Sequence, residues 1–458
     1  YFSVGFYSQD EHFQILSPVE FLLGINDNLS KEIWEFGDDA RIRPWFQSFI
    51  YFYIIKILQF LTIENPFIWM FFIKLIFSLL ALFALVLFYI NFRNRLFVDN
   101  NFSKIFVLLF CFYPFFHARS SSENLGMIFF IIGILFFDYL LKIKKNNSKF
   151  FYEILTGFLF GLAIITRYQI LIFIIGIYLW VFFFSLSYNN IRSLVIIGLN
   201  IIFVLVLGLI FDSYGYQQIN ITYYNYYYAN FISGMLDSFG TDPWWFYFLE
   251  ISKSFFPPIG LLFIIAFIYL IYKKFNNLII FIFLFYFLIF IFIGHKELRF
   301  LFPLMFFSPF FICAFLDKFT KLKIINFIKT LILFFNLLFL VIFSIIPATE
   351  QVSLYKYIYK NKNNLANIYY VEDNPYFVAG LNPKLYTHYL PKVKKINNNT
   401  NNNNEYFHLI TREQLNDKSL FKAKCNKAYS VYPDFIYINP NWKKHKFNWY
   451  FYDCKNQN

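Results

Sequence analysis

Two neighbouring acids near the start of the chain are the first residues whose types suggest chemistry. Asp10 and Glu11 are adjacent carboxylates in a long polar segment. A carboxylate within hydrogen-bond reach of a hydroxyl can take its proton, so this pair is a candidate general base. The pair could also bind a metal ion or be solvated loop charges. Two acids without further oxygen ligands are a weak metal signal, and we expect no metal site.

A second cluster, Gly294-His295-Lys296-Glu297-Leu298-Arg299-Phe300, places four ionisable residues between two long apolar segments. Charge beside a membrane is costly unless it faces water, a partner or a ligand, so such a cluster is a candidate functional site. The structural alternative is that Glu297 pairs with Lys296 or Arg299.

Two arginines also interrupt apolar sequence, Arg119 and Arg167. The planar, five-donor guanidinium suits a phosphate. The structural alternative pairs Arg119 with Glu123. We predict that five cationic groups bind a phosphate at the lipid–water boundary: Arg119, Arg167, His295, Lys296 and Arg299.

The elements that must position these residues are long apolar segments. The sequence is 59% hydrophobic and only 15% charged, whereas soluble domains carry about 25% charged residues. Apolar runs this long and unalternating are typical of membrane-spanning helices. We therefore predict an all-α polytopic membrane protein with about 10–12 transmembrane helices. The net charge of +13 fits basic loops flanking the membrane, and we expect no nucleic-acid partner.

The distribution of lysine and arginine predicts the topology. Placing five short basic loops in the cytoplasm puts the cationic clusters and residues 212–245 on the opposite face. One conflict remains: residues 46–63 and 105–116 cannot both span the membrane fully if residues 8–45 also lie outside. We expect a membrane domain over residues 1–347, with large external loops at 8–45 and 212–245.

The sequence changes after Pro347. Residues 348–458 are polar with short Tyr/Val/Ile runs, which favours a small extracytoplasmic α/β domain carrying an Asn-rich loop at 397–404. Cys425 and Cys454 share this domain. On an oxidising face they could form a disulfide, and two free thiols are an equal alternative.

Several motifs resemble those of the family 22 glycosyltransferases, the polytopic mannosyltransferases of the GT-C class. The residues 295–300 are similar to the family's His-Lys-Glu-x-Arg-Phe signature, and residues 10–14 resemble its Asp-Glu-x-Phe-Gln element. Trp34-Glu35-Phe36, Arg41-Ile42-Arg43 and Asp212-Ser213-Tyr214-Gly215-Tyr216 follow in the family's order. The chain departs from the pattern at Arg119-Ser120-Ser121-Ser122-Glu123 and at Pro44, and its Ser-Glu-Asn-Leu-Gly form looks more like bacterial members.

The resemblance implies a GT-C fold and an inverting transfer of mannose, or another hexose, from a polyprenyl-phosphate carrier to a glycan or glycolipid. Asp10 is then the base, with Glu11 as its helper or as an acceptor-positioning group, and the five cationic groups hold the carrier phosphate. No cofactor is implied, because the lipid-phosphate sugar is a substrate. Six residues are assigned to the acceptor or to loop structure: Trp34, Glu35, Arg41, Arg43, Asp212 and Tyr214.

Two other functions remain open. A transporter or flippase of a lipid-linked anionic substrate would also need basic residues near the membrane, although no internal repeat is visible. An inactive relative serving as an assembly subunit is less favoured because Asp10 is present. For location, we expect a bacterial inner membrane with a periplasmic site, or alternatively the endoplasmic reticulum membrane with a luminal site.

Overall fold

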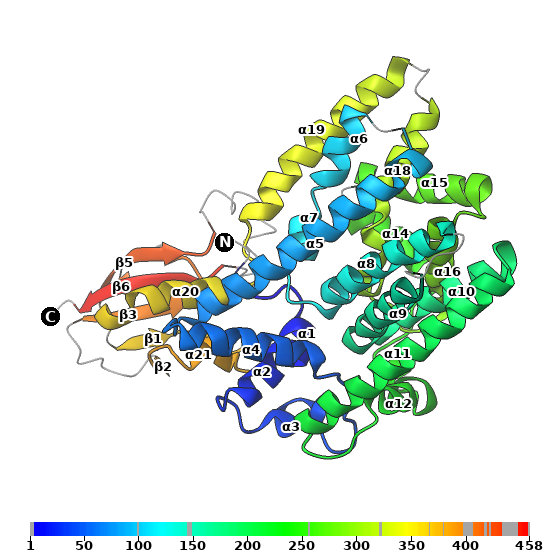
Figure 1. The fold of residues 1–458 in the computed structure, drawn as a ribbon. Helices are drawn as coiled ribbons and strands as arrows, with labels where there is room; N and C mark the ends of the chain where they lie inside the picture. The colour runs from blue at the N-terminus through cyan, green and yellow to red at the C-terminus, as the bar shows by residue number, and fades with distance from the viewer. Residues whose placement is uncertain are drawn as a thin grey trace. The chain divides into compact units, whose positions relative to one another are not determined.

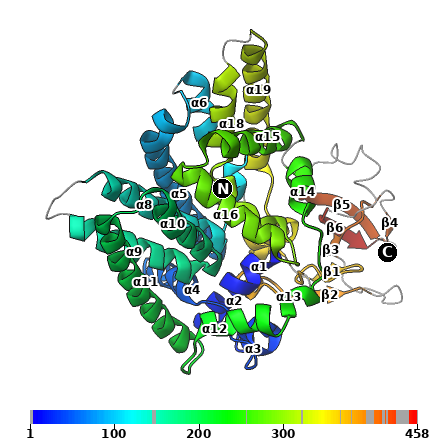
Figure 2. The same cartoon turned by 90° about the vertical axis from the view of Figure 1, so that its right-hand side faces the viewer.

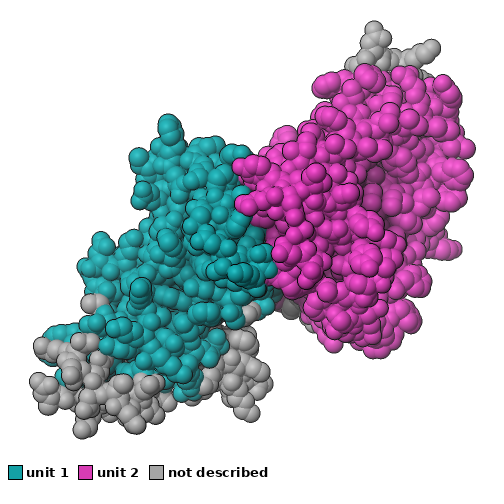
Figure 3. Space-filling model, turned by 90° about the horizontal axis from the view of Figure 1, so that it is seen from below, with its two compact units in different colours: residues 1–32, 52–72, 345–458 teal, residues 33–51, 73–344 magenta. Residues whose placement is uncertain are grey.

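The computed structural model describes residues 4–98, 100–143, 149–254, 257–319, 323–365, 367–378, 380–396, 406–415, 419–420, 423–432 and 448–456. The chain forms two compact units (Figure 3). Unit 1 comprises residues 1–32, 52–72 and 345–458, and unit 2 comprises residues 33–51 and 73–344. By their contacts residues 8–32 of the first polar stretch group with the C-terminal segment, whereas residues 33–45 group with unit 2. The Asn-rich loop at 397–404 lies outside the described residues.

The described part of the chain contains five helices that are long and apolar enough to cross a membrane. A sixth span is possible if a pair of helices bent by 60° is counted as one, and four further apolar helices are shorter. A multi-pass membrane protein is therefore confirmed, whereas the count of 10–12 helices stays a prediction. The five long helices are α5 (Pro66–Leu96), α8 (Ser122–Lys142), α9 (Lys149–Thr166), α11 (Tyr188–Gly215) and α19 (Lys323–Ile345).

Prolines break one segment that the sequence predicted to be continuous. Residues 301–316 fold as α17 (Phe302–Met305) and α18 (Ser308–Leu316), and Pro303 and Pro309 each stand in the first turn of their helix. Proline is tolerated there because the first backbone N–H groups have no partner within the helix. An apolar run alone carries no information about this break.

Residues 46–63 and 105–116, the two short apolar segments that cannot both span the membrane, also differ in the structure. Residues 105–116 are divided between α6 (Asn101–Leu108) and α7 (Tyr113–His117), with Pro114 in the first turn of α7. In contrast, α4 (Phe46–Phe60) is one continuous helix of 15 residues. At 1.5 Å per residue it is roughly 22 Å long, shorter than the ~30 Å hydrocarbon core. Both segments are therefore short, and α6–α7 is the interrupted one.

Glycines allow α9 to pack closely against α11 (Figure 1). A Cβ atom on Gly157 would lie 2.5 Å from the carbonyl oxygen of Ile197, and one on Gly161 would lie 2.5 Å from Cβ of Val204. Small residues at such positions let helix backbones approach in a membrane, where there is no hydrophobic drive between helices.

Figure 2 shows α11 at one edge of the helices of unit 2, and α8 packs beside α9. The core is largely phenylalanine; for example, Phe88 and Phe310 meet edge to face with ring centroids 4.9 Å apart. The further elements of this unit are η2 (Trp34–Phe36), η3 (Tyr168–Ile170), α10 (Leu171–Phe184), α12 (Thr222–Tyr227), η4 (Tyr228–Ile232), α13 (Met235–Ser238), α14 (Phe246–Ser254), α15 (Pro257–Lys274), α16 (Leu278–Phe292), η5 (Leu298–Leu301) and η6 (Asp317–Phe319).

Unit 1 contains a mixed six-stranded sheet in the order β2-β1-β3-β6-β5-β4. Strand β1 pairs in parallel with β2 and β3, and the other pairs are antiparallel. Helix α20 (Glu350–Asn361) packs on the sheet through Tyr357, which stacks on Tyr429 with ring centroids 4.3 Å apart. The predicted C-terminal sheet is thus confirmed. Its strands are β1 (Ile368–Tyr370), β2 (Val393–Lys395), β3 (Tyr406–Thr411), β4 (Ser419–Leu420), β5 (Ala423–Ser430) and β6 (Tyr450–Asn456).

Helical segments complete this unit. They are α1 (Gln9–Glu11), η1 (His12–Leu16), α2 (Ser17–Leu22), α3 (Leu29–Glu32), η7 (Lys362–Asn364) and α21 (Lys384–Thr387). Four of them lie near the N-terminus, η7 lies between α20 and β1, and α21 lies between β1 and β2.

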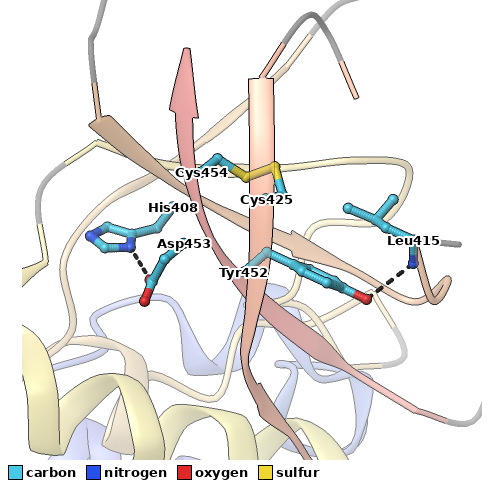
Figure 4. Close-up of a disulfide and its surroundings, with 6 residues drawn as sticks. All are labelled: His408, Leu415, Cys425, Tyr452, Asp453 and Cys454. Carbon is cyan, nitrogen blue, oxygen red and sulfur yellow. Dashed lines mark hydrogen bonds and ion pairs between the residues drawn. A yellow bond between two sulfur atoms is a disulfide. The ribbon is translucent and has the colours of Figure 1, made fainter. Parts of the chain in front are cut away.

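A disulfide joins Cys425 on β5 to Cys454 on β6 (Figure 4). The two residues lie directly opposite each other in the antiparallel ladder, which explains why the sulfur atoms meet. The sequence left open a disulfide or two free thiols, and the structure contains the disulfide. Beside the disulfide, His408 on β3 binds Asp453 on β6, with 2.8 Å between Nδ1 and Oδ1. Because disulfides persist in oxidising compartments, this bond favours an extracytoplasmic C-terminal domain.

We expect polyethylene-glycol maleimide to modify two cysteines in the unfolded, unreduced chain and all four after reduction, since Cys111 and Cys313 are free. The double variant Cys425→Ser/Cys454→Ser should unfold more easily. The bond closes a loop with a sequence separation of 29 residues, for which chain entropy gives about 3–4 kcal/mol. Gel mobility shifts and thermal unfolding test this. Four modified cysteines without reductant would contradict the disulfide.

Candidate active site

The two neighbouring acids of α1 have different environments in unit 1. Ser8 caps the helix: its Oγ accepts a hydrogen bond from the Asp10 N–H, while the buried Glu11 carboxylate accepts one from the Ser8 N–H at 3.4 Å. This is a capping box, which satisfies backbone donors at a helix start. Asp10 is partly exposed and accepts a hydrogen bond from Gln14 Nε2 at 2.6 Å. Asp10 is thus the more accessible of the two acids, and Glu11 supports the helix.

The segment beyond Pro347 holds the start of the chain in place. The Phe6 N–H donates to Thr349 Oγ1 at 3.0 Å, and the Phe6 ring stacks on His12 with centroids 5.1 Å apart. Gly5 has φ +87° and leaves no room for a Cβ atom beside Thr349. Burial lowers the pKa of His12 to about 3, so this ring is neutral and packs as an aromatic residue. The C-terminal domain therefore positions the helix that carries Asp10.

A second contact in unit 1 joins the polar stretch to α21. The Leu385 N–H donates to Glu20 Oε1 at 2.7 Å, and Lys384 Nζ lies 2.9 Å from Glu32 Oε1. Glu20 is completely buried, and burial raises its pKa to about 8. Glu20 was not among the residues singled out from the sequence, because its partners lie far along the chain.

The raised pKa of Glu20 predicts a pH-dependent stability. The folded pKa of about 8 lies above the ordinary value of 4.5, so stabilisation is complete below pH 4.5 and is lost as the pH rises through 8. The slope reaches at most about 1.4 kcal/mol per pH unit. Glu20→Gln can still accept the Leu385 hydrogen bond, so it should flatten this slope. Thermal unfolding between pH 5 and 8.5 measures it, with Glu32→Gln as the control that keeps the slope. An unchanged slope in Glu20→Gln would contradict the assignment.

In unit 2 the chain between α9 and α10 places Arg167 beside Glu123 of α8. Arg167 has an extended backbone, which ends α9, and its Nη2 lies 2.8 Å from Glu123 Oε1. Only 10% of each side chain is exposed. A buried guanidinium with one partner acid retains donors for a second anion. Arg167 also reaches Gln169 and, at 3.5 Å, Ser122.

Arg119 is buried near the same end of α8. Its guanidinium lies over the Phe115 ring, 3.4 Å from the centroid, and 5.4 Å from that of Phe302. The neighbouring small cavity is lined by Phe116, His117, Ser121, Glu123, Asn124, Met127, Phe302 and Phe306. Polar groups and a carboxylate therefore face a space beside two arginines.

The cluster at 295–300 forms an ion network around Glu297. Arg299 Nη2 donates to Glu297 Oε1 at 2.7 Å, and His295 Nε2 lies 3.1 Å from the same oxygen. His295 Nδ1 lies 2.9 Å from the Gly240 carbonyl. Both ring nitrogens of His295 thus face oxygen acceptors. Of the two pairings considered as the structural alternative, Glu297 with Lys296 or with Arg299, the structure contains the one with Arg299.

Lys296 in this cluster is buried and binds backbone carbonyl groups. Its ammonium donates to the carbonyls of Asp242 at 3.0 Å, Gly294 at 3.4 Å and Ile293. Three donors thus meet three backbone acceptors, which fixes the 240–245 turn against the cluster. Burial lowers the pKa of Lys296. The phosphate-binding role of Lys296 stays a prediction, and this geometry gives it a structural role.

The motif residues between 34 and 45 are tied to the end of α11. Arg43 pairs with Glu35, and the Tyr216 hydroxyl donates to the Arg43 carbonyl at 2.9 Å. Asp212 Oδ1 accepts the Trp45 N–H at 2.8 Å. Of the two roles considered for Glu35, Arg43 and Asp212, loop structure is the one that these contacts support.

Three further motif residues lie at the surface. Arg41 pairs with Asp38 at 2.6 Å. Trp34 is 43% exposed and Tyr214 is 73% exposed. These side chains remain accessible, and their acceptor role stays a prediction.

Aromatic contacts connect the region of Arg119 and Arg167 with the ion network around Glu297, and all of these residues belong to unit 2. Phe173 of α10, six residues after Arg167, stacks on Tyr286 of α16 with centroids 4.2 Å apart. The Tyr286 hydroxyl in turn donates to the Phe300 carbonyl at 2.8 Å. Asp10 belongs to unit 1. Among the described residues, no group of three or more His, Cys, Asp or Glu side chains could hold a metal ion.

A family model described as the Alg9-like mannosyltransferase family matches residues 2–377. GPI mannosyltransferase 3 of Candida albicans is 28% identical over 188 residues, which are 41% of this chain and 36% of that protein. A probable Dol-P-Man:Man(7)GlcNAc(2)-PP-Dol alpha-1,6-mannosyltransferase of Schizosaccharomyces pombe is 28% identical over 155 residues, 32% of this chain and 26% of that protein. The matches thus span about a third or less of each relative's length. No solved structure matches the chain.

Proposed function

The chain belongs to the Alg9-like mannosyltransferase family, and from this premise we propose that it transfers mannose from a polyprenyl-phosphate carrier to a glycan or glycolipid. The family match over residues 2–377 carries the proposal. The Schizosaccharomyces pombe relative is named for a Dol-P-Man donor, which supports a carrier of this kind. The names of both relatives describe mannosyltransferases, which favours an enzyme over a transporter or flippase.

In the proposed reaction Asp10 takes the proton of the acceptor hydroxyl. The acceptor oxygen attacks the anomeric carbon from the side opposite the phosphate, and the bond from that carbon to the phosphate oxygen breaks. The bonding electrons leave with the phosphate, and the configuration inverts. The leaving group is already stable as an anion, so cationic donors can assist it without a separate general acid.

We assign the carrier phosphate to Arg119, Arg167, His295 and Arg299. Arg119 and Arg167 together carry two positive charges beside the single acid Glu123, and Arg299 and His295 both lie against Glu297. Lys296 is better assigned to holding the 240–245 turn, because its donors already meet backbone carbonyls. Trp34, Arg41 and Tyr214 remain assigned to the acceptor side.

We propose that the reaction occurs on the extracytoplasmic face. The Cys425–Cys454 disulfide supports an oxidising compartment, either a periplasm or the lumen of the endoplasmic reticulum. The two reported relatives are yeast proteins and give no support to bacterial membership, so they favour the endoplasmic reticulum.

The proposal is tested with purified protein in lipid nanodiscs, a polyprenyl-phosphate donor carrying labelled mannose, and a panel of mannosylated glycolipid acceptors. We expect labelled product, with the same yield after EDTA treatment because no metal is assigned a role. Donor exchange across a vesicle membrane without transfer to any acceptor would support the flippase function instead. Activity lost with EDTA and restored by a divalent ion would contradict the metal-free mechanism.

A further inference from the structure

An exposed aromatic face runs along α12 and η4. Five outward side chains, each more than half exposed, are Tyr224, Tyr227, Tyr228, Phe231 and Ile232. Their spacing of three and four residues places them on one side of a helix. Residues 213–236 contain no charged side chain. A contiguous apolar patch of this kind is unusual on a surface that meets only water.

The opposite side of the same helix is fixed to the protein. Tyr226 lies under the Arg43 guanidinium, 5.9 Å from ring centroid to Cζ, and meets Tyr168 edge to face at 5.3 Å. Thr222 is buried and accepts a hydrogen bond from Asn220 at 2.8 Å. The outward direction of the aromatic face is therefore determined by packing on the other side.

This helix follows the end of a membrane-spanning helix. α11 has 28 residues, so at 1.5 Å per residue it is roughly 42 Å long and exceeds the ~30 Å hydrocarbon core. Its exposed stripe of Leu199, Phe203, Val206 and Ile210 is apolar, as a lipid-facing surface requires. Figures 1 and 2 show α12 lying across the end of α11 instead of extending it.

We propose that the outward face of α12 and η4 lies in the lipid–water interface of the bilayer and binds membrane lipid. This face follows the exposed apolar stripe of α11 along the chain. The bilayer that contacts that stripe is therefore the occupant that we assign to the face. Tyrosine rings suit the interface because an apolar ring and a polar hydroxyl sit at the same depth. Because Tyr226 on the inner side packs against Tyr168, the neighbour of Arg167, the lipid surface supports one wall of the candidate site. The inference does not depend on the sugar transfer.

Spin labelling measures directly whether the aromatic face contacts lipid or water. Cys111 and Cys313 are buried and the other two cysteines form the disulfide, so a nitroxide reagent should modify an introduced surface cysteine selectively. The test positions are Tyr228→Cys and Phe231→Cys. The control is Asp38→Cys, a charged site whose side chain is 87% exposed. Each labelled variant is reconstituted in phosphatidylcholine vesicles without donor, and its relaxation by oxygen and by a water-soluble nickel chelate is compared.

We expect oxygen to relax the labels at 228 and 231 several-fold more than the chelate does, and the chelate to dominate at 38. Chelate access at 228 and 231 equal to that at 38 would place the face in water and overturn the proposal. Exclusion of both reagents would indicate a covering protein or a second copy, which also overturns it. Oxygen access that arises only after polyprenyl phosphate is added would also overturn the proposal, since the face would then bind the donor chain and not membrane lipid.

Discussion

Asp10→Asn is expected to lower the rate of sugar transfer by about 10²–10⁴-fold, the usual contribution of a general base. Asparagine has nearly the same shape and can keep the contact with Gln14, but it cannot accept the acceptor proton. Donor affinity should stay close to that of the wild type, because the groups assigned to the phosphate are elsewhere in the chain. Single-turnover rates and donor binding, measured separately, test the two halves of this expectation.

Glu11→Gln is the matched control for this prediction. Glutamine also completes a capping box, so the helix should remain formed. A loss of transfer much smaller than that of Asp10→Asn would support the division between a reactive Asp10 and a structural Glu11. Equal losses in both variants would show that the carboxylates act as a unit, and full activity of Asp10→Asn would remove Asp10 from the role of base.

The sequence predicts the membrane class well because apolar length is a local property. α8 and α11 appear where long apolar runs predict them. Breaks within such runs are harder to predict, as at Pro303 and Pro309, because apolarity does not distinguish one long helix from two short ones. The grouping of residues 8–32 with the C-terminal domain could not be predicted. It depends on contacts such as Glu20 with Leu385, which are 365 residues apart.

The candidate site was predicted by residue type but not by pairing. The charged motif selected Lys296, and the interruption of an apolar run selected Arg167, yet nothing local shows that Arg167 pairs with Glu123, 44 residues earlier. The local pair of Arg299 with Glu297 was one of two alternatives considered from the sequence, because two residues so close can meet without knowledge of the fold. The carbonyl partners of Lys296 could not be predicted, since backbone acceptors carry no sequence signal.

Arg167→Met should have the largest combined effect on stability and donor binding. It leaves the Glu123 carboxylate buried without its guanidinium, and breaking a buried ion pair costs about 3–5 kcal/mol. If Arg167 also binds the carrier phosphate, donor affinity should fall by a further ~10–100-fold, the value of a hydrogen bond between charged groups. Thermal unfolding and donor titration in nanodiscs measure these effects separately.

The double variant Arg167→Met/Glu123→Gln distinguishes a structural arginine from one that binds the donor. Removing the acid's charge eliminates the orphaned carboxylate, so the stability should return toward that of the wild type. A purely structural Arg167 predicts that donor affinity returns with it. We expect instead that the double variant is stable and still binds the donor weakly, because no remaining group replaces the guanidinium at the phosphate. Glu123→Gln alone, which keeps the arginine and frees its donors, should bind the donor at least as well as the wild type. Wild-type donor affinity in the double variant would overturn the assignment of Arg167 to the phosphate and leave Arg119, His295 and Arg299 as the candidates.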